Sequence, residues 1–159
     1  MMSQVFVSGH KSPDTDSIAA ALSYSYLKRR LGMDAVAVRA GEINKESRFA
    51  LDYFDLEEPI LVTSVARKNP EDEKQKVILV DHNESKQTID GMDDAEVLEI
   101  IDHHRFGDFE SENPIFILVR PVGCVNTVIY GLYKANHIKP SREIAGIMLS
   151  AIISDTVLF

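Results

Sequence analysis

Residues 77–84 read VILVDHNE, and residues 97–104 read VLEIIDHH. In both stretches a run of mostly apolar, β-forming residues leads directly into an aspartate and a histidine. Continuous apolar strands are typical of parallel sheets, because such strands are buried on both faces. The two stretches therefore predict two buried parallel strands, Val77–Val80 and Val97–Ile101, that each run into polar side chains.

Strand-like runs alternate with amphipathic helical stretches along the rest of the chain. Further strands are expected at 4–8, 35–39 and 115–119, with 60–62 as a candidate short edge strand, and helices at 16–31, 44–54, 126–135 and 141–153. Asp16 or Ser17 is expected to open the first helix, and Asn44 to cap the second. This alternation predicts an α/β fold with a doubly wound, mostly parallel five-stranded sheet and helices on both faces.

Composition narrows the class of protein. The 159 residues are 45% hydrophobic and fit one domain, 1–159, while a net charge of −8 argues against a general nucleic-acid binder. No apolar run is long enough to span a bilayer, and the first residues lack the pattern of a signal peptide. The single cysteine, Cys124, cannot form an internal disulfide, which suits a reducing compartment. We therefore expect a cytoplasmic protein that binds neither nucleic acid nor membrane.

Histidines and aspartates collect where three of the expected strands end. They are His10, Asp14 and Asp16 after the first strand, Asp81 and His82 after the Val77–Val80 strand, and Asp102, His103 and His104 after the Val97–Ile101 strand. Ligands of parallel sheets bind at the carboxyl ends of the strands, so these groups should converge. Crowded carboxylates repel one another unless cations lie between them. Mixed imidazole and carboxylate ligands favour manganese, cobalt, iron or zinc over magnesium and calcium, which predicts a pair of such metals.

Several of these residues also have an ordinary structural interpretation. An aspartate after a strand is often a helix cap, and Asp16 could cap its own helix. His82 is expected to point away from its neighbour Asp81 and not to bind metal directly. His137 is expected at the surface, and Cys124 as a small buried residue rather than a nucleophile.

Three motifs carry a resemblance to a known family: HKSPDTDS at 10–17, VDHNE at 80–84 and DHHR at 102–105. Together they resemble the motifs of the family II inorganic pyrophosphatases, which belong to the DHH phosphoesterase superfamily. DHH alone marks the whole superfamily, including exopolyphosphatases and phosphodiesterases of nanoRNA and cyclic dinucleotides, whereas DHNE is the more specific marker. The resemblance covers the chain from Val5 to Phe159. It implies hydrolysis of inorganic pyrophosphate to two phosphates by a water that bridges two Mn²⁺ or Co²⁺ ions, with Mg²⁺ as an additional substrate-bound ion.

The resemblance also implies a role for each motif residue. The metal ligands would be His10 and Asp14 for one ion, Asp16 and His103 for the other, Asp155 as a further late ligand, and Asp81 as the catalytic bridge between both. His104 would contact the substrate or the leaving phosphate, with Lys11 and Arg105 as the cations that the motifs offer to it. Asp102 would orient an imidazole rather than bind metal.

Members of this family normally have a second, C-terminal (DHHA2-type) domain that clamps the substrate with lysines and an arginine. This chain ends in the apolar run Val157–Phe159, directly after a proposed ligand, and natural termini are usually more polar. We therefore expect residues 1–159 to be the N-terminal DHH domain alone, with reduced activity, pairing as a homodimer through a sheet edge. Two alternatives stay open: another DHH phosphoesterase, or a metal-binding dimerisation module with little activity.

Overall fold

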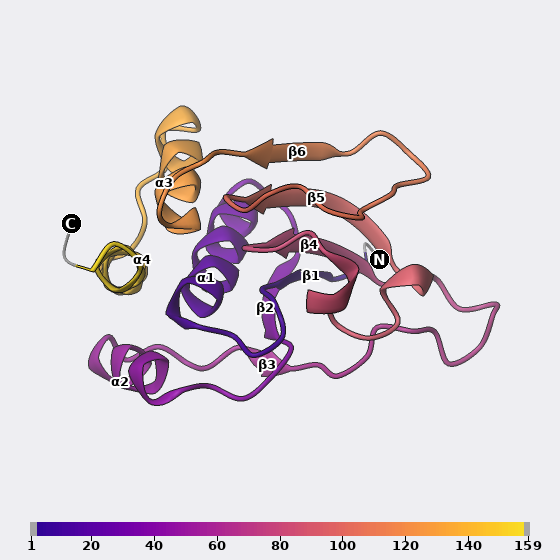
Figure 1. Cartoon of the computed structure of the whole chain (residues 1–159), viewed down its shortest axis with the longest axis horizontal. Coiled ribbons are helices and arrows are strands. Elements are labelled where there is room, and N and C mark those ends of the chain that lie inside the picture. Colours follow the sequence, from indigo (N-terminus) through magenta and orange to yellow (C-terminus); the bar gives the residue numbers. More distant parts are fainter. Residues whose placement is uncertain (1–2, 158–159) are drawn as a thin grey trace.

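A computed structural model describes residues 3–157 of the chain; Leu158 and Phe159, in the apolar run at the end of the sequence, lie outside the described residues. Its centre is a six-stranded sheet in the order β3-β2-β1-β4-β5-β6, in which every neighbouring pair is parallel (Figure 1). The strands are β1 (Val5–Ser8), β2 (Ala35–Arg39), β3 (Ile60–Leu61), β4 (Lys76–Val80), β5 (Glu96–Asp102) and β6 (Phe116–Val119). The α/β class and the parallel sheet are confirmed. The sheet has six strands rather than the expected five, because Ile60 and Leu61 pair with the end of β2 and form β3.

The two runs that predicted the fold form the adjacent strands β4 and β5. Residues 77–80 are all buried, and β5 ends in buried Ile100, Ile101 and Asp102. Alternate residues of β4 serve different faces of the sheet: Ile78 and Val80 belong to one hydrophobic cluster, and Val77 and Leu79 to another. Burial on both sides is the reason that this strand is apolar throughout.

The helices are distributed unevenly over the two faces of the sheet (Figure 1). The α-helices are α1 (Thr15–Arg30), α2 (Lys45–Tyr53), α3 (Val125–Ala135) and α4 (Arg142–Asp155). Helix α1 packs on β1, β2 and β4, α3 packs on β5, and α4 packs on α1 and α3. The opposite face is covered by the loop residues Val65 and Ile89 and by Met92. Two 3-10 helices, η1 (Ser85–Gln87) and η2 (Met92–Asp94), lie in the connection between β4 and β5.

The starts of the first two helices show how local sequence sets their boundaries. Asn44 caps α2 as expected, since its side chain accepts a hydrogen bond from the Ser47 amide at 2.8 Å. Helix α1 is capped by Asp14, whose Oδ1 accepts from the Ser17 amide at 2.9 Å. The expectation that Asp16 or Ser17 opens this helix is therefore wrong. Asp14 has the extended backbone that a cap requires, and Asp16 lies inside the first turn.

Residues 66–75, between β3 and β4, form a largely exposed loop. Among residues 3–157, no helix combines the length and the apolar character needed to cross a membrane.

Candidate metal centre

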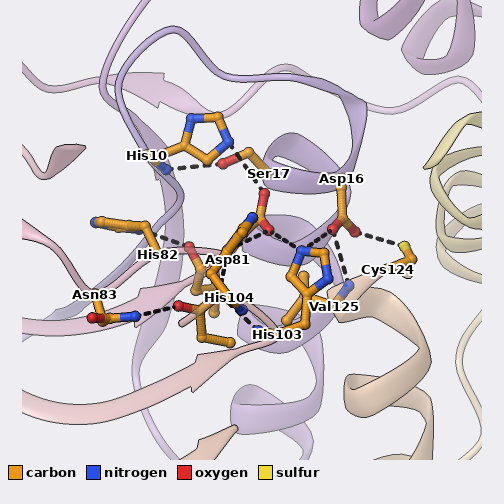
Figure 2. Close-up of polar contacts among 12 residues, drawn as sticks. His10, Asp16, Ser17, Asp81, His82, Asn83, His103, His104, Cys124 and Val125 are labelled. Carbon is orange, nitrogen blue, oxygen red and sulfur yellow. Dashed lines mark hydrogen bonds and ion pairs between the residues drawn. The ribbon is translucent and has the colours of Figure 1, made fainter. Parts of the chain in front are cut away.

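The strand ends that carry aspartates and histidines lie side by side, because β4 is hydrogen-bonded to β1 on one side and to β5 on the other. The turn from β1 into α1, the end of β4 and the end of β5 therefore meet at the carboxyl edge of the sheet (Figure 2). Gly9 lets the turn pass close to α1, since a Cβ atom at this position would lie 1.9 Å from Ser17 Oγ.

One group of side chains consists of His10, Asp14 and Asp81. The Nε2 atom of His10 lies 3.6 Å from Asp14 Oδ1 and 3.3 Å from Asp81 Oδ2. The other ring nitrogen of His10 is hydrogen-bonded to the Lys11 carbonyl at 2.6 Å. That hydrogen bond fixes the ring, so the Nε2 atom faces the carboxylates.

A second group consists of Asp16, His103 and Asp155. The Nε2 atom of His103 lies 3.5 Å from Asp16 Oδ2, and one ligand atom from each of the three residues falls within 4.8 Å of the others. The Nδ1 atom of His103 is hydrogen-bonded to the Val122 carbonyl at 2.8 Å, which orients this ring in the same manner. Asp155 is the last residue of α4, and its side chain reaches this group.

Asp81 belongs to the first group and also contacts the second. Its Oδ2 faces His10 at 3.3 Å, and its Oδ1 lies 2.9 Å from His103 Nε2 (Figure 2). Asp81 also has a positive φ of 62°, which is unusual for a residue with a Cβ atom and costs on the order of 1–3 kcal/mol. The fold thus keeps a strained backbone where one carboxylate faces both groups.

The electrostatics of the edge show how closely its negative charges are packed. Burial alone would lower the pKa of His10, but its hydrogen bonds to Asp14 and Asp81 outweigh burial and raise that pKa to about 10. Burial also opposes the charged form of His103, yet its bond to Asp81 and the nearby carboxylates raise its pKa to about 9. Burial and the charge of Asp16 raise the pKa of Asp155 to about 7. The raised pKa values of these three groups reflect the negative charge that is crowded at this edge, which bound cations would offset.

The donor set fits a pair of divalent transition metals. Two imidazoles and four carboxylates form two groups of three ligands, and the second group has a fourth if Asp81 is counted with both. Each imidazole is oriented by a backbone carbonyl on its second nitrogen, as is usual for metal-binding histidines. The structure thus brings the expected ligands together, and their roles stay predictions.

His104 lies beside these groups and is oriented by Asp102. The Nδ1 atom of His104 is 2.7 Å from Asp102 Oδ1, and Asn83 donates to Asp102 Oδ2 at 2.7 Å. Asp102 is fully buried, whereas the side chain of His104 is half-exposed. His104 lines a cavity of about 290 Å³ together with His82, Asn83, Glu84, Gln87 and Arg105. A buried carboxylate holding an exposed imidazole is the arrangement expected for Asp102.

The two cations of the motifs lie in ion pairs outside the two groups. The Nζ atom of Lys11 is 2.5 Å from Asp90 Oδ1, and the Nε atom of Arg105 is 3.0 Å from Glu84 Oε1. Arg105 is largely exposed and lines the cavity beside His104, whereas Lys11 does not line it. Substrate contact by either residue would require its side chain to leave the carboxylate partner.

The two remaining histidines belong to neither group. His82 is buried, its Nδ1 atom is bonded to the Val80 carbonyl, and burial lowers its pKa to about 4. His137 is exposed.

Cys124 is buried as expected, but it has a partner that the sequence did not suggest. Its Sγ atom lies 2.8 Å from Asp16 Oδ1, and Val125 and Asn126 at the start of α3 also donate to this carboxylate. Sequence reasoning missed these residues because no motif links them to Asp16, which lies more than a hundred residues earlier.

Residues 4–152 match the model of the DHH family, N-terminal domain. A protein of Bacillus licheniformis named "Probable manganese-dependent inorganic pyrophosphatase" is 51% identical over 99% of this chain and 50% of its own length. A protein of the same name from Exiguobacterium is 50% identical over the same shares. The chain spans about half the length of the curated relatives that it matches.

Solved structures agree with these similarities. A candidate family II inorganic pyrophosphatase of Methanococcus jannaschii superposes with a TM-score of 0.85 at 40% identity, over 98% of this chain and 50% of that one. An exopolyphosphatase-related protein of Bacteroides fragilis shares the fold, with a TM-score of 0.67 at 19% identity over 98% of this chain and 46% of that one. These matches confirm the resemblance that the three motifs carry. The chain belongs to the DHH family, and the N-terminal domain of that family spans residues 4–152 of it.

Proposed function

We propose that this chain is the metal-binding domain of an inorganic pyrophosphatase, which hydrolyses pyrophosphate to two phosphates at a centre of two metals. The observation that carries the proposal is the single carboxylate of Asp81, whose two oxygens face two separate groups of metal-ligating side chains. The names of the relatives favour manganese, and the mixed imidazole and carboxylate ligands would also suit cobalt. Mg²⁺ would enter as an ion carried by the substrate.

The bound cations would lower the pKa of a water molecule and neutralise charge that develops on the phosphoryl oxygens. The side chains of the centre would hold the reacting groups in place. Asp81 would join the two halves of the site, with His10 and Asp14 on one side and Asp16, His103 and Asp155 on the other. Asp102 would accept a hydrogen bond from Nδ1–H of His104 and stabilise the imidazolium form, in which the opposite ring nitrogen, Nε2, also carries a proton and could donate it to the leaving phosphate.

Substrate orientation requires cations opposite the centre, because pyrophosphate is a polyanion. Lys11 and Arg105 would contribute after they leave Asp90 and Glu84. The chain carries a net charge of −8, and its curated relatives are about twice as long. We therefore assign the main phosphate clamp to a second, C-terminal domain outside residues 1–159.

We further propose a cytoplasmic homodimer. Strand β6 is at one edge of the sheet and exposes Phe116 and Ile117, so it could pair with the same strand of a second copy. The free thiol of Cys124 suits the reducing cytoplasm.

The test is a phosphate-release assay on Mn²⁺-loaded protein with pyrophosphate, tripolyphosphate and a dinucleotide as separate substrates. Preferential release from pyrophosphate is expected. Faster turnover of tripolyphosphate would indicate an exopolyphosphatase, and cleavage of the dinucleotide a phosphodiesterase. Binding of Mn²⁺ with no turnover of any substrate would favour a non-catalytic metal-binding module.

A further inference from the structure

We propose that the N-terminus of α3, together with the side chains of Asn126 and Cys124, positions Asp16 so that only its Oδ2 atom is available to a metal. Asn126 and Cys124 would be positioning residues, since they act through Asp16 and touch no substrate. This inference rests on the proposed metal centre.

The two oxygens of Asp16 have different surroundings. Oδ1 accepts from Asn126 Nδ2 at 2.6 Å, from Cys124 Sγ at 2.8 Å and from the Asn126 amide at 3.3 Å. Oδ2 accepts one hydrogen bond, from the Val125 amide at 2.9 Å, and lies 3.5 Å from His103 Nε2 (Figure 2). A carboxylate oxygen has two lone pairs. The three donors therefore use both lone pairs of Oδ1. Oδ2 keeps one free lone pair, and this oxygen faces His103, the other expected ligand.

The hydrogen bonds to Asp16 also cap the N-terminus of α3. Cys124 is the N-cap residue of α3, yet its own side chain makes no capping hydrogen bond. The carboxylate of Asp16, which comes from the first turn of α1, accepts from the first two amides of α3 in its place. The positive end of the α3 dipole stabilises a negative carboxylate here, in a position that is only 1% exposed.

Asn126 is itself held in one orientation. Its Nδ2 atom donates both to Asp16 Oδ1 and, at 3.1 Å, to the Asp16 main-chain carbonyl. Its Oδ1 atom accepts from Ser23 Oγ at 3.0 Å, and both Asn126 and Ser23 are fully buried. A buried asparagine with both ends of its amide bonded cannot rotate without leaving polar atoms unpaired. Asp16 therefore has little freedom to present Oδ1 instead of Oδ2.

The first test replaces Asn126 by alanine and titrates the metal-free chain with Mn²⁺ by calorimetry. Wild-type protein should show two sites; a wild type without Mn²⁺ binding would instead refute the proposed function. In Asn126→Ala, one of the two affinities should fall about 10- to 100-fold, as is common when a group that orients a metal ligand is removed. The other site, formed around His10 and Asp14, should keep the wild-type affinity, because Asn126 contacts none of its expected ligands. Asn136→Ala is the matched control, because Asn136 ends the same helix and is exposed.

Electron paramagnetic resonance gives a readout that a general loss of stability would not produce. Two neighbouring Mn²⁺ ions give an exchange-coupled signal, and loss of one site should leave the hyperfine pattern of an isolated ion. Unchanged coupling and affinities in folded Asn126→Ala, or equal weakening of both sites, would overturn the inference.

Cys124 supplies a second pair of variants in case Asn126→Ala does not fold. Cys124→Ser keeps a donor near Asp16 Oδ1 and should retain both affinities, whereas Cys124→Ala removes that donor and should weaken the same single site. Equal behaviour of the serine and alanine variants would contradict a positioning role for the Cys124 side chain.

Discussion

At the scale of single residues, Asp81 has the most demanding position in the proposed centre. Its backbone is held in the left-handed region, and its amide donates to the Ile101 carbonyl at 3.0 Å. These constraints direct one carboxylate oxygen towards His10 and the other towards His103. A residue in this place can serve two cations only as a carboxylate, because an amide offers one acceptor oxygen rather than two.

We therefore expect Asp81→Asn to weaken both Mn²⁺ sites, by at least the roughly 10- to 100-fold that is typical for groups around a metal. Calorimetric titration of the metal-free variant measures both affinities. Asp52→Asn, at an exposed position on α2, is the matched control and should bind as wild type does. A variant that lost one site and kept the other would contradict the bridging role.

As proposed metal ligands, His10 and His103 would link metal binding to pH. Their pKa values are raised to about 10 and about 9, so the folded metal-free chain holds protons that the unfolded chain releases near an ordinary pKa of 6.5. The stability that comes from these protons is fully present below pH 6.5 and is lost as pH rises through 9 and 10. Asp155, with its pKa raised to about 7, acts in the same direction at lower pH.

The melting temperature of metal-free protein should accordingly fall between pH 7 and pH 9, whereas that of the Mn²⁺-loaded protein should fall less. The reason is that cations replace the protons between the carboxylates. A change of 1 kcal/mol shifts the melting temperature of a domain of this size by roughly 2–4 °C, which calorimetry resolves. His103→Gln should flatten the metal-free curve, and His137→Gln, at the surface, should leave it unchanged. Parallel curves with and without Mn²⁺ would argue against histidine ligands.

At the scale of elements, the turn between β1 and α1 depends on close packing. Gly9 faces Ser17 Oγ so closely that no side chain fits, and the His10 amide donates to that same oxygen at 2.9 Å. The turn carries His10 and Asp14, so any shift of the turn would displace two of the three expected ligands of one group.

Gly9→Ala should therefore destabilise the chain by about 1–3 kcal/mol, the usual cost of overpacking, and should also weaken Mn²⁺ binding. Urea unfolding and calorimetry measure the two effects. Gly131→Ala is the matched control, since a Cβ atom there meets nothing within 4 Å and alanine favours the helix. Gly9→Ala with the stability of wild type would show that the turn is looser than its contacts indicate.

The two edges of the sheet differ as sites for pairing. Strand β6 offers four residues, with Phe116 and Ile117 about half-exposed, whereas β3 has only two residues. Longer pairing buries more surface and satisfies more backbone groups, so the proposed dimer should form through β6.

We expect a dimer in sedimentation experiments at micromolar concentration, and a monomer for Ile117→Lys, because a lysine on an edge strand opposes pairing. Ile60→Lys, on the exposed edge strand β3, should remain dimeric. Wild-type protein that sediments as a monomer would remove the dimer without affecting the metal chemistry.

At the scale of the whole molecule, charge limits what the chain can do alone. Its net charge is −8, and the two cations of the motifs are already paired with carboxylates. A polyanionic substrate would find few free cations near the centre, and cations aimed at developing charge usually provide the largest share of catalysis.

Residues 1–159 should therefore hydrolyse pyrophosphate far more slowly than a two-domain relative. Loss of one stabilising donor commonly costs about 10²–10³ in rate, and the proposed clamp would supply several. Phosphate release should be measured for the chain alone and with the C-terminal half of a relative added in trans. Full activity of the chain alone would show that no second domain is needed.

The amino-acid sequence by itself determined the parallel α/β fold and the edge at which the site forms. The reason is local: short continuous runs of β-forming residues such as Val77–Val80 favour buried strands, and residues that follow parallel strands share one edge of the sheet. The cap of α2 by Asn44 was also predictable, because an N-cap bonds to an amide three residues away.

Only the tertiary structure decided which groups hold the ligands in place. The partnership of Asp16 with Asn126 arises where α1 packs on α3, and no local pattern encodes a contact between residues so far apart. The ion pairs of Lys11 with Asp90 and of Arg105 with Glu84 likewise depend on how loops fold back over the sheet. Side-chain pairing across the fold is set by packing, which is the physical reason that the motifs predict the ligands but not the residues that support them.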